Sequence, residues 1–330
     1  MFNNFISIKE IFNMAEETGF IKFKKILIKL FSGKEERIKI TWQNCNENKK
    51  EWWAIPTVKK RWNYLISGDE NIDYNQYVLK KYLSKKDNLK ALSFGCGAGQ
   101  RELKWAETGK FKKIDAFDLS EKRIKYAREQ AKKVGLQNIT NFETDDVYNI
   151  PIREDYYDVV LGEQSLHHFS PLRKIFLIIN KFLKADGLFV VNEFVGPNRF
   201  QWTDRQIEVT NALLTILPKK YKLKYNNNHI KRKIYRPSIL RMIMSDPSEA
   251  VESSNILPLL DENFEIIELK EYGGTILSLL FSEIAQNFKS DEKCVNQFLK
   301  IYFEIEDMLL KTGEINSDYI FAVCKKRNIQ

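Results

Sequence analysis

A glycine-rich turn that follows a short apolar run carries the clearest chemical signal in this chain. Gly95, Gly97 and Gly99 alternate directly after residues 92–94. Because glycine has no Cβ, it lets a backbone turn sharply and approach a ligand closely. A dinucleotide-binding fingerprint requires a third small residue at its sixth position, where this chain has Gln100. The spacing therefore favours a cofactor without a pyrophosphate and disfavours a nicotinamide dehydrogenase.

An acidic residue follows one expected helix and one expected strand later. Asp118 lies at the end of the run 114–119 and 23 residues after Gly95, since 118 − 95 = 23. At the tip of a second strand, a carboxylate can accept hydrogen bonds from both hydroxyls of a ribose. A glycine cluster alone could be only a tight turn, so it is the added acid that indicates a nucleoside site.

At these residues the chain resembles the class I S-adenosylmethionine-dependent methyltransferases, close to the bacterial small-molecule group with type 11-like domains. The three glycines match the first motif of that family, and the acid that follows them matches the second. Residues 146–151, Asp-Val-Tyr-Asn-Ile-Pro, match the third motif, and residues 157–168 and 183–191 match the fourth and fifth. The chain departs from the family at Ser93, where an acid is frequent. This departure concerns how the glycine turn is braced.

The resemblance implies which residues hold S-adenosylmethionine and its product S-adenosylhomocysteine. Asp146 would face the adenine amino group with the Val147 backbone beside it. Glu163 would hold the methionine amino group or shape the acceptor site. The cofactor-binding residues implied by the resemblance are Gly95, Cys96, Gly97, Gly99, Gln100, Asp118, Leu119, Asp146, Val147 and Glu163.

Methyl transfer from a sulfonium asks for alignment more than for acid or base groups. The methyl group is already a strong electrophile, so the protein must hold nucleophile, methyl carbon and sulfur near a line. An amine or carboxylate acceptor could react without a base, whereas an alcohol must lose its proton and benefits from a nearby imidazole or carboxylate. We expect His168 to be that base, beside His167, with Glu193 as the alternative or as an orienting partner. In the family a His-His pair also recurs as a structural feature of this turn, so that role stays open.

Missing motifs narrow the acceptor. After the fourth expected strand the chain has Gly-Glu-Gln-Ser at 162–165, and not the Pro-Pro-aromatic segment that accompanies methylation of base amines in this fold. It also lacks a Pro-Cys dipeptide, the paired-glutamate loop of arginine methyltransferases, and the Asp plus Asp-Asn set that holds magnesium in catechol-type enzymes. The sequence therefore predicts a metal-independent enzyme that methylates a small molecule, with oxygen as the favoured atom.

Metal centres and disulfides are not expected. The four cysteines are scattered without CxxC spacing, which gives neither a disulfide framework nor a zinc site. Of the three histidines, two are adjacent and should point apart. These residues are Cys45, Cys96, Cys294 and Cys324, the pair His167 and His168, and His229.

The chain is basic, with a formal net charge of +9 and a pI near 9.1. Such a balance could indicate an acidic partner, such as nucleic acid, a phosphorylated substrate or an anionic membrane. Lysine and asparagine are abundant throughout, so we favour a compositional origin, with the charge spread along the chain. A basic amphipathic stretch within residues 17–33 could lie on an anionic membrane or pack on its own domain. Neither an apolar run of 18 residues nor a cleavable signal pattern occurs, so we expect a soluble cytoplasmic protein.

Four regions are expected along the chain. Strands and helices alternate over residues 88–195, which predicts a doubly wound, Rossmann-like α/β fold. Its seven-stranded sheet should be mostly parallel, with helices on both faces. Residues 1–87 should form a helical region that covers the cofactor, and residues 261–330 should supply the last two strands with a helical insert. The insertion at 196–260, interrupted by prolines, should be a lid or, alternatively, a structural cap or an oligomer contact.

This insertion, together with the N-terminal helices, is expected to bind the acceptor. Its polar and aromatic residues suit a sugar-, nucleotide- or phosphate-bearing metabolite, because arginine binds phosphate and carboxylate well. We therefore predict O-methylation of a small polar acceptor by in-line displacement. An RNA-binding methyltransferase, whose binding would fall steeply with salt, and a non-catalytic cofactor-binding scaffold stay open, and the sequence indicates no oligomeric state. The acceptor-binding candidates are Arg199, Trp202, Arg205 and Arg236.

Overall fold

The computed structural model describes residues 41, 51–225 and 229–327. The amphipathic stretch expected within residues 17–33, like Cys45, lies outside the described residues. The described chain forms a seven-stranded sheet in which β7 runs antiparallel to both of its neighbours and the other pairs are parallel. This confirms the expected fold. In sheet order the strands are β3 (Thr140–Thr144), β2 (Phe111–Asp118), β1 (Leu89–Phe94), β4 (Tyr157–Glu163), β5 (Leu183–Phe194), β7 (Tyr319–Lys326) and β6 (Phe264–Gly273).

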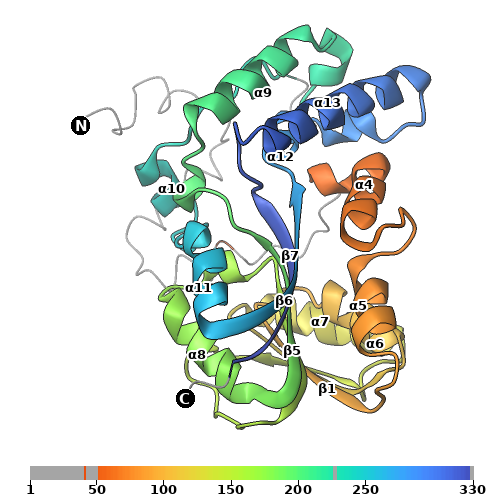
Figure 1. The fold of residues 1–330 in the computed structure, drawn as a ribbon, viewed down its shortest axis with the longest axis vertical. Helices are drawn as coiled ribbons and strands as arrows, with labels where there is room; N and C mark the ends of the chain where they lie inside the picture. Colours follow the sequence, from red (N-terminus) through yellow and green to blue (C-terminus); the bar gives the residue numbers. More distant parts are fainter. Residues whose placement is uncertain (1–40, 42–50, 226–228, 328–330) are drawn as a thin grey trace.

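Helices cover both faces of the sheet (Figure 1). Successive strand residues point to opposite faces. In β1, Ala91 packs in the apolar cluster that includes α4, α5 and α6, whereas Leu92 packs in the cluster that includes α8 and α11. Along α8 the buried residues Ile175, Phe176 and Ile179 recur at helical spacing, a stripe that the sheet covers. The flanking helices are α4 (Pro56–Ser67), α5 (Tyr74–Tyr82), α6 (Gln100–Glu107), α7 (Glu121–Lys133), α8 (Leu172–Phe182) and α11 (Ile256–Asn263).

Strands β1 and β4 are neighbours at the centre of the sheet. The chain leaves β1 toward β2 on one side and leaves β4 toward β5 on the other. In open sheets of this kind, ligands bind outside the carboxyl ends of the strands at such a switch point. Because β1 ends at Phe94 and β4 ends at Glu163, the glycine turn and the histidine pair leave the sheet at this same edge.

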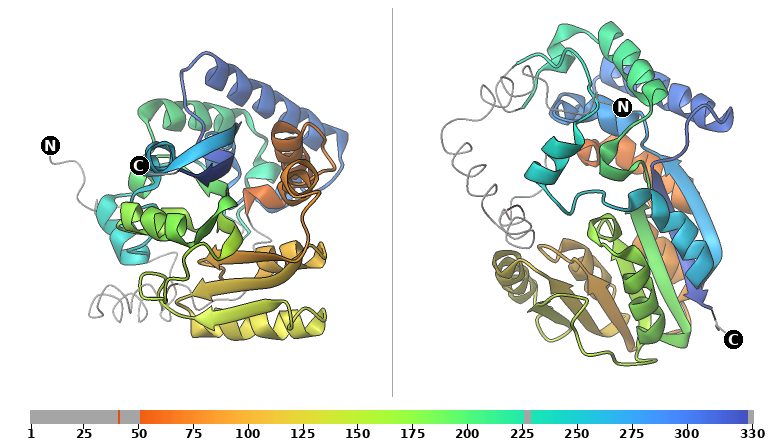
Figure 2. Two further views of the ribbon diagram at one scale, coloured as in Figure 1. Left: turned by 60° about the horizontal axis from the view of Figure 1, so that its bottom comes forward. Right: turned by 90° about the vertical axis from the view of Figure 1, so that its left-hand side faces the viewer.

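Two inserts lie beyond the carboxyl end of β5. The first, called the lid below, spans residues 196–255, and the second joins β6 to β7. Leu213 and Leu214 of the lid share an apolar cluster with Leu279 and Tyr302 of the second insert. Figure 1 shows α9, α12 and α13 together at this end, and Figure 2 shows the same arrangement from two further sides. The lid contains η3 (Asn198–Phe200), α9 (Asp204–Ile216), η4 (Lys219–Lys222), α10 (Ile239–Ser245) and η5 (Ser253–Asn255), and the second insert contains α12 (Leu277–Phe281), η6 (Ala285–Phe288) and α13 (Lys293–Lys311).

One boundary differs from the expectation. The expected end of the insertion at residue 260 falls inside α11, which packs on α8 and β6 and so belongs to the sheet layer. Among the described residues, the structure has no helix with the length and apolar character needed to cross a membrane.

Candidate active site

The glycine turn is shaped by backbone conformations that side chains rarely adopt. Gly95, Gly97 and Gly99 have φ values of +68°, +56° and +76°. Gly99 caps the N-terminus of α6, and a Cβ there would lie 2.7 Å from Phe142 and 2.8 Å from Ala127. Any larger residue would therefore both strain the turn and push it away from β3 and α7. This leaves a cradle of bare backbone at the tip of β1, which fits a nucleoside cofactor.

Asp118, at the tip of β2, braces this turn. One carboxylate oxygen accepts a hydrogen bond from the Gly97 N–H at 2.9 Å, and the other accepts one from the Ser120 N–H at 2.8 Å. Each carboxylate oxygen has two lone pairs, so both oxygens can still accept a ribose hydroxyl. Burial raises the pKa of Asp118, while the two backbone hydrogen bonds and the charge of Arg123 act in the opposite direction.

Position 93 contacts a buried carboxylate of the following helix. The Ser93 hydroxyl donates a hydrogen bond of 2.6 Å to Glu102 of α6, and both residues are buried. Burial raises the pKa of Glu102 to about 7, against the hydrogen bond from Ser93 and together with the charge of Glu163. The serine at the end of β1 therefore has a carboxylate partner on α6.

The other predicted cofactor residues lie around the same edge and remain predictions. Glu163 is buried and accepts a hydrogen bond of 3.1 Å from the Trp105 indole, and burial raises its pKa, with Arg101 opposing. Asp146 is half-buried and accepts a bond of 3.0 Å from the backbone N–H two residues on. Cys96 and Val147 are buried, Leu119 is half-buried and Gln100 is exposed.

The histidine pair lies on a turn whose first residue, Ser165, packs against the glycine turn. After β4 the chain forms the 3-10 turn η2 (Leu166–His168), and a Cβ on Gly95 would lie 2.9 Å from the Cβ of Ser165. The rings of His167 and His168 do not point apart, as expected from their adjacency in the sequence, because the tight turn brings their centroids to 4.1 Å. The expectation that adjacent histidines diverge is therefore wrong for this turn.

Glu193 organises this turn from the end of β5. Its side chain is fully buried. One oxygen accepts hydrogen bonds of 2.7 Å from the N–H groups of both Ser165 and Leu166. The other oxygen accepts a hydrogen bond of 2.7 Å from the Phe194 N–H and lies 2.5 Å from His167 Nδ1. With four partners Glu193 is well placed to orient His167, because a neutral His167 that donates from Nδ1 keeps Nε2 as its acceptor.

The lid brings a further carboxylate, that of Glu249, close to His167. The sequence did not indicate this contact. Glu249 Oε1 lies 3.6 Å from His167 Nε2. Next to it, the Ser248 hydroxyl donates 2.6 Å to Asp246 and lies 3.4 Å from His168 Nδ1. One ligand atom each of His167, His168 and Glu249 fall within 4.8 Å of one another, so among the described residues this cluster also has the spacing of a cation site.

Burial and neighbouring charges separate the proton affinities of this cluster. Burial, assisted by the charge of Asp246 and opposed by His167, raises the pKa of Glu249 to about 7. Burial alone would lower the pKa of His167, but the charge and hydrogen bond of Glu193, with Glu249, raise it. For His168, burial and the neighbouring ring hold the pKa well below its usual 6.5.

Arg199, predicted to bind the acceptor, holds the lid loop that carries Glu249. Its guanidinium donates to the carbonyl oxygens of Pro247 at 2.8 Å, Glu249 at 3.0 Å and Asp246 at 3.4 Å. The backbone N–H of Arg199 donates a hydrogen bond of 2.6 Å to the Ala250 carbonyl oxygen. Both Arg199 and Ala250 have positive φ, +55° and +47°. Strained residues held by many contacts concentrate at functional sites, and these two fix the position of Glu249.

The remaining lid candidates lie nearer the surface. Arg205 is exposed and pairs with a glutamate of the second insert at 2.6 Å. Arg236 is exposed and pairs with Asp204 at 2.6 Å. Trp202 is half-buried and stacks on Phe200, with ring centroids 5.6 Å apart and planes within 11°. Their role toward an acceptor remains a prediction.

Known proteins resemble this chain over its sheet and lid. A family model described as a methyltransferase domain matches residues 85–263. The uncharacterized methyltransferase YcgJ of Bacillus subtilis is 25% identical over 108 residues, 33% of this chain and 42% of the relative. Erythromycin 3''-O-methyltransferase of Saccharopolyspora erythraea is 25% identical over 121 residues, 37% of this chain and 39% of the relative. The chain thus spans about two fifths of the length of these curated relatives.

A solved structure shares the fold over nearly the whole chain. It is geranyl diphosphate C-methyltransferase from Streptomyces coelicolor A3(2), in complex with Mg2+, geranyl diphosphate and S-adenosyl-L-homocysteine. The likeness has a TM-score of 0.51 and covers 90% of this chain and 99% of that chain at 12% identity. The family model covers more than half of the chain. The glycine cradle and Asp118 suit the binding of S-adenosylmethionine. The chain therefore belongs to the methyltransferase domain family and shares the fold of a class I S-adenosylmethionine-dependent methyltransferase.

Proposed function

We propose that this protein methylates a hydroxyl oxygen of a small polar acceptor bound between the sheet and the lid. The observation that carries the proposal is the row Glu193, His167 and Glu249. Glu193 also binds the backbone N–H of Ser165, the residue that packs against the glycine turn. S-adenosylmethionine supplies an electrophilic methyl group on a sulfonium. A hydroxyl acceptor releases a proton on methylation, so it needs a proton acceptor close to the cofactor. The row provides one.

Within the row, Glu249 is best suited to take the proton. A general base works best when its pKa lies near the working pH, and the pKa of Glu249 is raised to about 7. The pKa of His168 lies well below 6.5, so His168 stays neutral at pH 7 and is the weaker base. We therefore assign the base role to Glu249 rather than to His168. His168 would hydrogen-bond the acceptor, and Glu193 would hold His167 in place.

The acceptor is proposed to be a sugar-, nucleotide- or phosphate-bearing metabolite. Support comes from the name of a relative, erythromycin 3''-O-methyltransferase, and from the stacked pair of Trp202 and Phe200, which offers an aromatic surface at the lid. Arg199 already binds backbone carbonyls of the lid loop. Recognition of an anionic group would therefore fall to Arg205 and Arg236, whose exposed carboxylate partners a ligand anion could replace.

The test combines cofactor binding with a screen of acceptors. Calorimetry with S-adenosylhomocysteine should show binding, and radiolabelled S-adenosylmethionine should label a methyl ether in one class of hydroxylated sugars, nucleotides or phosphorylated polyols. Cofactor binding without label in any such class would favour the scaffold alternative. Label that appears in RNA instead, with binding that falls steeply as salt rises, would favour the RNA alternative. Either result would overturn the proposal.

A further inference from the structure

One segment of the lid carries a net positive charge as large as that of the whole chain. Residues 209–245 contain nine lysines and arginines and no acid. The whole chain has 53 basic and 44 acidic residues, so the rest of the chain has 53 − 9 = 44 basic residues and is neutral overall. The net charge of this one segment, +9, therefore equals the net charge of the whole chain. The nine are Lys219, Lys220, Lys222, Lys224, Lys231, Arg232, Lys233, Arg236 and Arg241.

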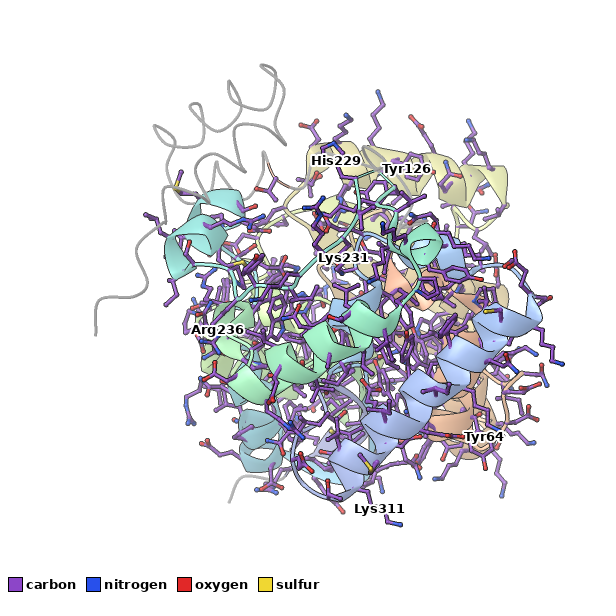
Figure 3. All side chains as sticks on the ribbon, turned by 90° about the horizontal axis from the view of Figure 1, so that it is seen from above. Tyr64, Tyr126, His229, Lys231, Arg236 and Lys311 are labelled. Atoms are coloured by element: carbon purple, nitrogen blue, oxygen red, sulfur yellow. The ribbon has the colours of Figure 1, made fainter. Side chains whose placement is uncertain are left out.

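One of these cations anchors the segment, and most of the others face water. Lys231 is buried and donates to the carbonyl oxygens of Leu279 at 2.7 Å and Ser282 at 2.6 Å, which ties the lid to the second insert. The stretch around it, marked by His229 and Arg236, crosses the face seen in Figure 3. Five of the nine cations form no ion pair with any described residue. They are Lys219, Lys222, Arg232, Lys233 and Arg241.

The same segment exposes apolar side chains. Of the fourteen large apolar side chains that are exposed among the described residues, seven lie between residues 216 and 240. Ile216 is 64% exposed and Tyr235 is 65% exposed. Exposed apolar side chains that gather in one part of a protein can mark an interaction surface. The seven are Ile216, Leu223, Tyr225, Ile230, Tyr235, Ile239 and Leu240.

We propose that this outer face of the lid docks the protein on an anionic lipid bilayer. Cations intermixed with exposed aliphatic groups suit a bilayer surface, because the aliphatic groups can enter the boundary of the acyl chains while the cations meet anionic headgroups. Five of the seven apolar groups are isoleucine or leucine. A nucleic acid would use the cations but would leave these aliphatic groups in water. The proposal is independent of the methyl acceptor, and it concerns a different segment from residues 17–33.

Vesicle co-sedimentation of the full chain tests this docking surface. Vesicles of phosphatidylcholine with phosphatidylglycerol should bind the protein at least about tenfold more tightly than phosphatidylcholine alone, and added salt should weaken the binding. The variant Lys219→Gln/Lys222→Gln/Lys233→Gln should lose about 10²-fold in affinity, since each cation near the surface contributes separately. The variant Ile216→Ser/Leu240→Ser should lose about tenfold or more while its charge is unchanged.

A matched control replaces three exposed lysines of α7, as Lys125→Gln/Lys132→Gln/Lys133→Gln, and should bind like the wild type. Unchanged melting temperatures and unchanged S-adenosylhomocysteine binding establish that each variant is folded. The proposal is overturned if the triple lid variant still binds vesicles like the wild type. It is also overturned if the α7 control loses as much vesicle binding as the triple lid variant. Lid-dependent binding to single-stranded RNA in the absence of vesicle binding overturns it as well. None of these readouts requires methyl transfer, so they can fail or succeed apart from the proposed function.

Discussion

The two sides of the candidate active site are built in different ways. On the cofactor side, the backbone of the glycine turn contacts Asp118, 21 residues from Gly97, within one strand-helix-strand unit. On the acceptor side, side chains from three distant segments meet, since Glu193 lies 26 residues and Glu249 lies 82 residues from His167. The cofactor side therefore depends on local backbone shape. The acceptor side depends on how the lid packs, and it is the side on which specificity can change without loss of the cofactor.

The largest expected effect separates the two sides at Glu249. Glu249→Gln should lower kcat by about 10²–10⁴-fold, because an amide cannot accept the proton of the acceptor. Its affinity for S-adenosylhomocysteine should be unchanged. Steady-state methyl transfer and calorimetry measure the two quantities. Glu129→Gln, on the exposed side of α7, is the control and should keep the wild-type rate. A parallel loss of cofactor affinity in Glu249→Gln would contradict the separation.

The pH dependence of the rate sharpens the same assignment. The pKa of Glu249 is about 7, and its ionised form must take the proton. Below this pH, kcat/KM should fall about tenfold for each unit, and above it the rate should level off. A pH series on the wild type and on Glu249→Gln measures this decrease in kcat/KM at acidic pH. The decrease should be absent in the variant. If the variant still shows it, the ionisation belongs to another group.

A pair of glycine variants tests the cofactor side alone. Gly99 and Gly109 both have positive φ, +76° and +70°, but a Cβ at Gly99 meets Phe142 at 2.7 Å whereas a Cβ at Gly109 meets nothing within 4 Å. Gly99→Ala should weaken S-adenosylhomocysteine binding by about 10–100-fold, because overpacking displaces the turn. Gly109→Ala should lower the free energy of unfolding by about 1–2 kcal/mol and leave cofactor binding unchanged. Equal affinities for the cofactor in the two variants would refute this account.

A smaller effect is expected where β7 begins beside the lid. Burial and the charge of Glu306 raise the pKa of Asp318 to about 8, despite a hydrogen bond from Gln206. In the unfolded chain the ordinary pKa of this carboxyl is 3.8. The folded state therefore binds the proton more tightly, and stability from this group falls as pH rises from about 4 to about 8.

Asp318→Asn removes this dependence because the amide is neutral throughout. The free energy of unfolding at pH 7 should rise by about 1–3 kcal/mol, as measured by urea denaturation at acidic and neutral pH. A destabilised variant at neutral pH would show that the ionised form is the one that the fold prefers. The acceptor side would then carry a buried charge that this structure does not explain.

Removal of metal ions should have the smallest effect. Dialysis against a chelator should change the rate by no more than about twofold, because proton transfer to Glu249 needs no cation. A complete loss of activity that manganese or zinc restores would mean that His167, His168 and Glu249 bind a cation. The acceptor side would then work through a metal and not through a carboxylate base.

The sequence predicted the structure best where contacts join neighbours in the chain. It predicted the doubly wound, mostly parallel sheet and the position of Asp118 at the tip of the second strand, since a glycine turn and the tip of the next strand lie in one contiguous unit. It did not predict that Glu102 would reach Ser93, because that contact depends on how α6 packs on the sheet. It placed the histidine pair correctly in the chain but not in space, because ring orientation depends on the 3-10 turn and on Glu193.

The amino-acid sequence by itself determined the cofactor, because positive φ angles at alternate positions demand glycine and the acids stand at the tips of adjacent strands. Only the tertiary structure decided which groups meet in the row that we propose faces the acceptor. Glu249 belongs to no local motif. It reaches His167 because Arg199 binds the backbone carbonyls of the loop that carries Glu249 and so holds this loop against the sheet edge. A contact across 82 residues depends on the packing of the whole insert, which no short pattern of residues specifies.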